Sequence, residues 1–123
     1  LPLLEGDLFE IMQATTEGTL DEVHFSFADK CACCLVAASE GYPVSYEKGF
    51  EITLPEEHDN IFIAGSRLED GVQRTSGGRV LGVTEVADTL QEAVDKAYAT
   101  MKTVHFDNMY YRKDIGAKAL EVK

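Results

Sequence analysis

Residues 75–104 read TSGGRVLGVTEVADTLQEAVDKAYATMKTV, and this stretch joins two kinds of secondary structure. Residues 79–87 are rich in valine and leucine and predict a strand. Thr89 and Glu92 then have the spacing of a capping box, which marks the start of a helix. The apolar residues beyond it recur at helical spacing: Leu90, Ala93, Ala97, Met101 and Val104. The stretch therefore predicts a strand followed directly by a helix that ends before Phe106.

Upstream of this stretch the pattern indicates further strands. Residues 72–75 predict a short strand, preceded by a turn at Glu69-Asp70-Gly71 and by a strand over 61–68. Residues 22–29, EVHFSFAD, alternate apolar and polar side chains, and residues 30–39, KCACCLVAAS, are nearly all apolar. We expect two strands there, joined near residues 29–30.

The first residues predict a helix of roughly three turns. Asp7 and Glu10 have N-cap and N3 spacing, apolar residues follow at helical intervals, and Gly18 suits the C-terminal end. The tail, residues 106–123, is aromatic and basic and predicts one last helical turn. A helix, several strands at hairpin spacing and a second helix indicate an α+β fold with a mostly antiparallel sheet, in a single domain over 1–123.

Composition excludes several classes of protein. The 123 residues include 22 acidic and 11 basic side chains, a formal net charge of −11, which disfavours binding to nucleic acid. No apolar run approaches the roughly 20 residues that span a membrane, so no membrane partner is expected. The chain begins with Leu1 and not with methionine, which suggests a piece of a longer chain or a processed one.

Cysteine and histidine predict neither a metal site nor a catalytic residue. Cys31, Cys33 and Cys34 lie in one apolar stretch, and no second ligand pair accompanies them as zinc would require. In a strand the first two share a face and Cys34 points the opposite way. We expect all three to be buried, reduced thiols of a cytoplasmic protein. The three histidines, at positions 24, 58 and 105, are expected to be structural or surface residues.

Thr75-Ser76-Gly77-Gly78-Arg79 allows two interpretations. Glycine pairs between short strands form tight turns, because glycine adopts positive φ without steric cost. Alternatively, unhindered backbone amides, the Ser76 hydroxyl and the Arg79 guanidinium hold a phosphate or a carboxylate. The two are compatible, since a turn can also bind an anion.

Lys48 stands beside Tyr46 in the glycine- and proline-broken loop SEGYPVSYEKGFEI, residues 39–52. A lone lysine in a loop is ordinarily a solvated charge. A base next to an aromatic ring in a long irregular loop is also a candidate for ligand contact.

Several stretches together closely resemble the C-terminal domain of the phosphoribosylamine–glycine ligase family. They occur in one order along the chain: GYPVSYEKGFEIT, TSGGRVLGVT, DTLQEAVDKAY and FDNMYYRKDIGAKAL. The opening LPLLEGDLFEIM resembles the segment where the family's chain leaves its ATP-binding domain. One departure is Ile63-Ala64-Gly65-Ser66, where relatives often read His-Ala-Gly-Thr, so no role falls on a histidine there.

The resemblance implies an ATP-grasp ligase of purine biosynthesis. The family joins glycine to 5-phosphoribosylamine with ATP, through a glycyl phosphate, and yields glycinamide ribonucleotide. Its ATP-binding groups and magnesium ligands belong to ATP-grasp domains upstream of Leu1, which would be partners in the same chain. The isolated chain is therefore expected to bind neither cofactor and to be inactive, with no catalytic or metal residue of its own.

The resemblance also bears on the fold and the site. It implies a partly barrel-like sheet with flanking helices, of the rudimentary barrel-sandwich hybrid type. It favours the anion-binding interpretation, because the substrate carries a phosphate, and it assigns substrate contact to six residues: Tyr46, Lys48, Ser76, Gly77, Gly78 and Arg79. The alternative is a stand-alone, non-catalytic module that binds a small anion or serves in docking.

Overall fold

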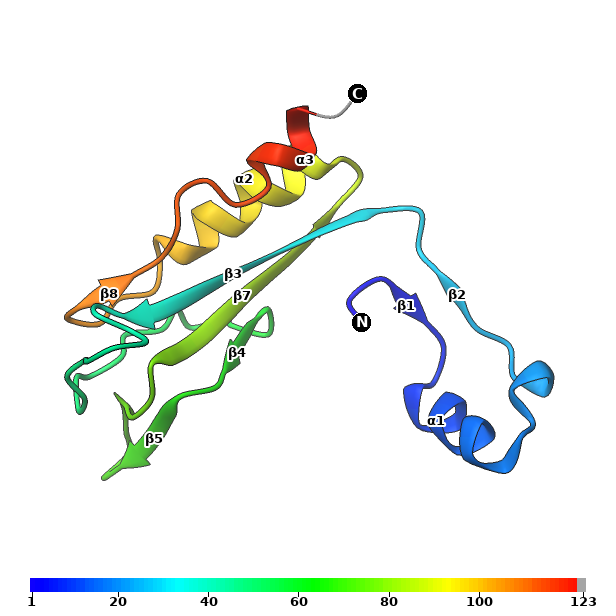
Figure 1. Ribbon diagram of the computed structural model, residues 1–123, viewed down its shortest axis with the longest axis horizontal. Coiled ribbons are helices and arrows are strands. Elements are labelled where there is room, and N and C mark those ends of the chain that lie inside the picture. Colours follow the sequence, from blue (N-terminus) through cyan, green and yellow to red (C-terminus); the bar gives the residue numbers. More distant parts are fainter. Residues whose placement is uncertain (122–123) are drawn as a thin grey trace.

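The structure is a computed structural model that describes residues 1–121, and Figure 1 shows its two regions. Residues 1–29, here called the arm, extend away from residues 30–121, here called the body. The arm holds β1 (Leu4–Glu5), α1 (Leu8–Glu17), the 3-10 helix η1 (Leu20–Glu22) and β2 (Ser26–Phe27). The body holds β3 (Cys31–Ser39), β4 (Ile61–Ile63), β5 (Ser66–Glu69), β6 (Val72–Thr75), β7 (Arg79–Ala87), α2 (Leu90–Met101), β8 (Met109–Tyr110) and α3 (Ala117–Glu121).

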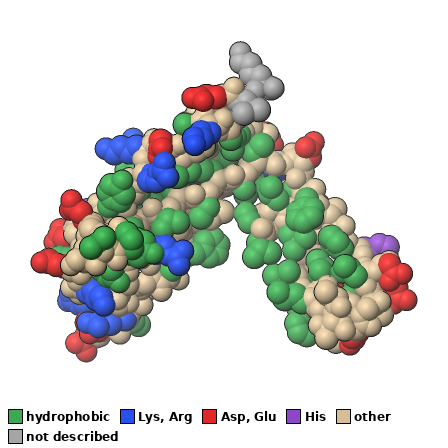
Figure 2. Space-filling view, in the orientation of Figure 1, with side chains coloured by type: hydrophobic (Ala, Val, Ile, Leu, Met, Phe, Trp, Pro, Cys, Tyr) green, Lys and Arg blue, Asp and Glu red, His purple; other side chains and the backbone are tan. Residues whose placement is uncertain are grey.

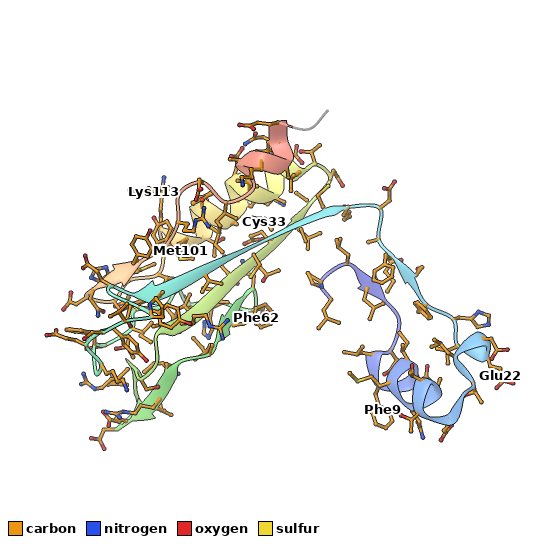
Figure 3. All side chains as sticks on the ribbon, in the orientation of Figure 1. Phe9, Glu22, Cys33, Phe62, Met101 and Lys113 are labelled. Carbon is orange, nitrogen blue, oxygen red and sulfur yellow. The ribbon has the colours of Figure 1, made fainter. Side chains whose placement is uncertain are left out.

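The centre of the body is an antiparallel sheet in the order β4-β7-β3-β8, with α2 packed on one face. Leu35 on β3 pairs with Val83 on β7, and both side chains are fully buried. Figure 3 places Cys33 and Met101 in the layer between β3 and α2. The buried apolar cluster draws its members from the body, and among residues 1–30 none belongs to it.

The predicted strand and helix of residues 79–104 are confirmed. The Thr89 hydroxyl accepts a hydrogen bond from the Glu92 amide at 3.2 Å, as an N-cap should. The helix ends at Met101, earlier than the apolar spacing indicated. Val104 is nevertheless buried, because the chain turns there and the Val104 amide donates to the Met101 carbonyl.

The strand predicted over 61–68 is in fact two strands. It breaks at Ala64-Gly65, whose amides both donate to the carbonyl of Val80 at 2.9 and 3.0 Å. The chain then leaves the central sheet and forms the β5–β6 hairpin. The hairpin turn lies where it was predicted, with positive φ at Asp70 and Gly71.

Val80 is an extra residue in β7. Ala37 pairs with Leu81 and Ala38 pairs with Arg79, so Val80 has no partner on β3. Such a β-bulge re-aims the side chains beyond it. Val80 and Leu81 are both buried in succession, and Arg79 is exposed.

The arm forms its predicted helix but buries little. Asp7 accepts hydrogen bonds from the amides of Phe9 and Glu10, and Gly18 ends α1 in the left-handed conformation. The strand predicted over 22–29 is wrong for most of its length, because η1 occupies its start and β1 pairs only with Ser26–Phe27. Ala14 is buried, and Figure 2 shows apolar side chains on the surface of the arm. The exposed large ones are Leu1, Leu8, Phe9, Met12, Leu20, Phe25 and Phe27.

The arm is also strongly acidic. It contains no lysine or arginine, and its acidic residues are Glu5, Asp7, Glu10, Glu17, Asp21, Glu22 and Asp29. The ion pairs of the described chain all lie in the body.

The cysteines point to the predicted faces of the strand, but not all of them are buried as predicted. Cys33 is buried and Cys34 points out of the opposite face, where it is exposed; Cys31 is half-buried against the core. Burial, and to a lesser degree the neighbouring Cys34, raises the pKa of the Cys33 thiol. Cys33 is therefore a packing residue, as predicted, whereas Cys34 is not.

The architecture is mixed α and β with antiparallel sheets, as the sequence predicted. Over residues 1–121 the central sheet stays open, with β4 and β8 at its edges, and no barrel closes. None of the described helices is both long and apolar enough to cross a membrane.

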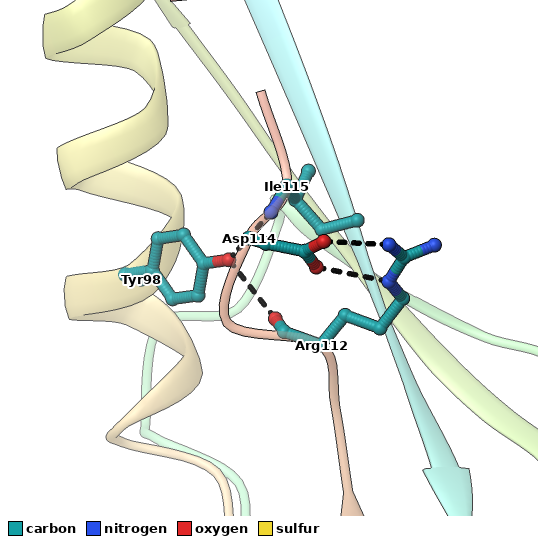
Figure 4. Close-up of polar contacts among 4 residues, drawn as sticks. All are labelled: Tyr98, Arg112, Asp114 and Ile115. Carbon is teal, nitrogen blue, oxygen red and sulfur yellow. Dashed lines mark hydrogen bonds and ion pairs between the residues drawn. The ribbon is translucent and has the colours of Figure 1, made fainter. Parts of the chain in front are cut away.

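The C-terminal tail is held against α2 by Tyr98 (Figure 4). The Tyr98 hydroxyl donates to the Arg112 carbonyl at 2.9 Å and accepts from the Ile115 amide at 3.1 Å. Between these two points, the Arg112 guanidinium binds both carboxylate oxygens of Asp114. This ion pair lowers the pKa of Asp114, mainly through the hydrogen bond from Arg112.

Candidate functional site

An open cleft of about 670 Å³ lies on the outer side of the central sheet, opposite α2. Its floor comes from three strands, with Val36 on β3, Gly82 on β7 and Phe62 on β4 in register with one another. In Figure 3 Phe62 lies on the side of the sheet that faces the arm. The cleft is also lined by Gly65, Gly78, Arg79 and Tyr42.

Close backbone contacts join Gly65 to the TSGG turn at Gly77. A side chain on Gly65 would place its Cβ 2.3 Å from the Arg79 carbonyl oxygen and 3.0 Å from Gly77 Cα. The Gly65 carbonyl accepts hydrogen bonds from the amides of Ser76 and Gly77, at 2.9 and 3.0 Å. On the other side, the Ser39 amide donates to the Gly78 carbonyl at 2.8 Å.

These hydrogen bonds leave the predicted anion site with fewer free backbone donors. The amides of Ser76 and Gly77 already have an acceptor in the chain, so they are not the free donors that the sequence suggested. Gly78 and Arg79 line the cleft, whereas Ser76 and Gly77 do not. The turn is thus a structural link to Gly65 that positions Arg79.

Among residues 1–121, Arg79 differs from the other arginines in having no acidic partner. Arg67 and Arg74 pair with Glu69, and Arg112 pairs with Asp114. The ion pairs and side-chain hydrogen bonds found in residues 1–121 include none from the Arg79 guanidinium, which is exposed at the cleft. In a chain of net charge −11, an arginine without a carboxylate partner is a strong candidate for binding an external anion.

Sequence reasoning missed Tyr42. Its ring lies against Gly78 so closely that a Cβ on that glycine would be 1.9 Å from the ring. An aromatic residue three positions after a strand, between Gly41 and Pro43, was a visible signal. Its contact with a glycine 36 positions away depends on the tertiary structure, and no local pattern contains it.

Tyr46 and Lys48 lie next to the cleft and do not line it. The Tyr46 ring centroid is 6.0 Å from that of Tyr42, and the Lys48 ammonium lies 5.6 Å from the Tyr46 centroid. The neighbouring Gly49 amide donates to the Thr75 carbonyl at 2.7 Å, which ties this loop to the start of the TSGG turn.

Chemically, the cleft combines one guanidinium with apolar and aromatic walls. This suits a small ligand that carries an anionic group and a less polar body. The lining residues include no carboxylate, histidine or cysteine that could act as acid, base or nucleophile. Within residues 1–121, no three His, Cys, Asp or Glu side chains gather to hold a metal ion.

Comparison with known proteins gives consistent results. The family described as "Phosphoribosylglycinamide synthetase, C domain" matches residues 32–118. A phosphoribosylamine–glycine ligase from Caldanaerobacter subterraneus subsp. tengcongensis is 46% identical over 119 residues, which is 95% of this chain and 28% of that protein. A "Bifunctional purine biosynthetic protein PUR2,5" from Pichia angusta is 48% identical over 127 residues, 100% of this chain and 16% of that one.

Among solved structures, the chain is similar to phosphoribosylamine–glycine ligase from Thermotoga maritima. The TM-score is 0.65 at 49% sequence identity, over 68% of this chain and 21% of that one. This chain therefore spans less than a third of the length of the relatives described here.

Proposed function

Because this chain belongs to the family of phosphoribosylglycinamide synthetase C domains, we propose that it is the C-terminal domain of a phosphoribosylamine–glycine ligase. The proposed reaction joins glycine to 5-phosphoribosylamine with ATP, through a glycyl phosphate, and gives glycinamide ribonucleotide for purine biosynthesis. The relatives named as this ligase are much longer than the present chain, which supports a role as one part of such an enzyme.

Within that enzyme we assign the cleft to the phosphoribosyl substrate. The observation that carries this assignment is the unpaired guanidinium of Arg79, which lines the cleft beside Gly78 in an acidic chain. A substrate phosphate would supply the negative charge that no carboxylate among residues 1–121 provides to Arg79, and arginine binds phosphate through paired hydrogen bonds. By covering a substrate bound between domains, the body would help to close the active site.

The arm is the proposed contact with the preceding ATP-grasp domains. Its exposed Phe9, Met12, Phe25 and Phe27 form an apolar surface with no cover in residues 1–121. Such a surface marks an interaction site in a folded protein. The larger size of the relatives supports a partner within the same polypeptide, which we place before this chain.

Magnesium does not fit the residues of the cleft. Magnesium prefers oxygen ligands such as carboxylates, and the cleft offers apolar groups and one guanidinium. We therefore place magnesium, together with the ATP that it accompanies, in the preceding domains and expect the isolated chain to be inactive. Magnesium-dependent release of ADP by the purified 123-residue chain, above a heat-treated control, would contradict this placement.

Two finer expectations belong to the same proposal. One is a cytoplasmic location, in keeping with the reduced cysteines. The other is a partly barrel-like closure of the sheet in the longer enzyme, for which the β5–β6 hairpin beyond β4 is the available element.

The test is Arg79→Ala in the full-length enzyme. Hydrogen bonds to charged groups contribute about 1.5–3 kcal/mol each, so kcat/KM for phosphoribosylamine should fall roughly 10- to 100-fold. The KM values for ATP and glycine should change little. Arg67→Ala is the matched control, because Arg67 is paired with Glu69 on the hairpin and does not line the cleft.

The rival outcomes are distinct. A large fall in melting temperature with unchanged phosphoribosylamine kinetics would make Arg79 structural. Tight binding of a small anion by a protein that never forms glycinamide ribonucleotide, even at full length, would favour the non-catalytic binding module instead.

A further inference from the structure

The ring of Tyr42 occupies space that only a glycine at position 78 leaves open. A Cβ on Gly78 would lie 1.9 Å from one ring carbon of Tyr42 and 2.4 Å from the next. Gly78 does not have a positive φ, so its backbone conformation alone does not require glycine. The requirement comes from the Tyr42 ring, and the ring thereby reaches the cleft beside Arg79.

The backbone and a second ring also position Tyr42. Its amide donates to the Ser39 carbonyl at 3.1 Å, and the Ser39 amide in turn donates to the Gly78 carbonyl. The Tyr46 ring lies at 6.0 Å with a tilt of 58°, a geometry favourable for an aromatic pair. Despite these contacts, Tyr42 remains 43% exposed. A residue held this firmly and left open to solvent is suited to contact a ligand.

We propose that Tyr42 is a second binding residue of the cleft, and that its ring contacts the pentose of the substrate whose phosphate binds Arg79. This inference rests on the proposed function and extends it to one further residue. A flat ring packs against the C–H groups of a sugar, and the phenol can exchange hydrogen bonds with a sugar hydroxyl. Gly78 takes part indirectly, as the residue that leaves room for the ring.

Two probes separate the roles of Tyr42 and Arg79 in the full-length enzyme. Glycinamide ribonucleotide contains both pentose and phosphate, whereas inorganic phosphate lacks the pentose. Tyr42→Ala should raise the Kd for glycinamide ribonucleotide about 10-fold and leave the Kd for inorganic phosphate within about 2-fold. Arg79→Ala should weaken the binding of both probes.

A double-mutant cycle tests the contact between Tyr42 and Gly78. Gly78→Ala should displace the ring and raise the Kd for glycinamide ribonucleotide about 5- to 10-fold. In a Tyr42→Ala background the same change should have less than about a 2-fold effect, because no ring remains to be displaced. Tyr42→Leu keeps apolar bulk and serves as the second variant if Tyr42→Ala does not fold.

The outcomes distinguish the two proposals. If Tyr42→Ala and Tyr42→Leu bind glycinamide ribonucleotide as the wild type does, while Arg79→Ala does not, the role of Tyr42 is refuted and the proposed function stands. Equal weakening of both probes by Tyr42→Ala also refutes it, because Tyr42 would then act only by moving Arg79. A wild-type enzyme that fails to bind glycinamide ribonucleotide would overturn the proposed function itself.

Discussion

The helices of the arm and the body begin with the same kind of capping residue, but they bury different numbers of side chains. Both of their long helices begin with a side-chain N-cap, Asp7 for α1 and Thr89 for α2. In α2 the residues buried are Ala93, Val94, Ala97 and Met101, whereas α1 buries Ala14 alone. Caps and spacing therefore specify where a helix forms, and they do not supply what it packs against.

The charges of the two regions differ in the same way. The body pairs many of its charges internally, as in Lys30–Asp88 and Arg112–Asp114. The arm has acidic residues and no basic ones. An apolar surface surrounded by unpaired acidic residues suits a partner surface surrounded by basic residues. We therefore expect the preceding domains to present lysine or arginine around their contact with the arm.

The largest expected effect separates the two cores. Leu35→Ala removes a fully buried side chain from the centre of β3 and should lower the free energy of unfolding by about 3 kcal/mol. Leu20→Ala makes the same chemical change in the arm at a residue that is 40% exposed. It should cost less than about 1 kcal/mol in chemical denaturation of the 123-residue chain. Equal losses would mean that the arm shares the core of the body.

The next effect tests the close backbone contact between Gly65 and Arg79 at the cleft. Gly65→Ala forces a Cβ against the Arg79 carbonyl and should destabilise the chain by about 1–3 kcal/mol. Gly82→Ala is the matched control on β7, because its Cβ would meet Cys34 Sγ at 3.6 Å, an ordinary contact. If thermal melts show the two variants to be equally stable, the close approach of Gly65 is not required.

A smaller effect in the isolated chain should become a large one in the longer enzyme. Phe9 is 71% exposed, so Phe9→Ser should change the stability of the 123-residue chain by less than about 0.5 kcal/mol. In the full-length enzyme the same change should lower the melting temperature and raise hydrogen exchange in the arm, since Phe9 would be buried there. A neutral result at full length would remove Phe9 from the domain contact.

The smallest effect concerns pH. Arg112 lowers the pKa of Asp114, so this pair stabilises the body above the ordinary carboxyl range, about pH 4, and the contribution is lost as pH falls through the lowered pKa. The pair is exposed, so we expect only a slight change in melting temperature. Asp114→Asn should melt slightly below the wild type at pH 7 and at the same temperature in strong acid. A constant difference across pH would assign the effect to another cause.

The sequence predicted those elements whose determinants are local. The β7–α2 stretch combines a strand pattern with a cap at Thr89, and the β5–β6 turn has residues that tolerate positive φ. The break at Gly65 escaped prediction, because it depends on hydrogen bonds to Val80 across the sheet. Cys34 was assigned the right direction and the wrong surroundings, since sequence does not reveal whether a second layer covers that face.

In the candidate site, too, features with local determinants were predicted and long-range contacts were not. Gly78 and Arg79 were predicted from their residue types and do line the cleft. The six-residue assignment could not show that the Ser76 and Gly77 amides bond to Gly65, nor that Tyr42, and not Lys48, lines the cleft with Arg79. These are contacts between segments far apart in the chain, and they follow from packing.

The β-bulge at Val80 keeps the Arg79 side chain on the outer face of the sheet. Val83 and Leu81 face the core, and strict alternation would turn Arg79 toward the core as well. The extra residue shifts the alternation by one position. Leu81 and Val83 therefore still face the core, while the Arg79 side chain lies on the opposite face of the sheet. Without the extra residue Arg79 would stand three positions before Val83, and regular alternation would place its guanidinium on the same outer side. The bulge therefore lets β7 bury one more residue, Val80, without moving the cation.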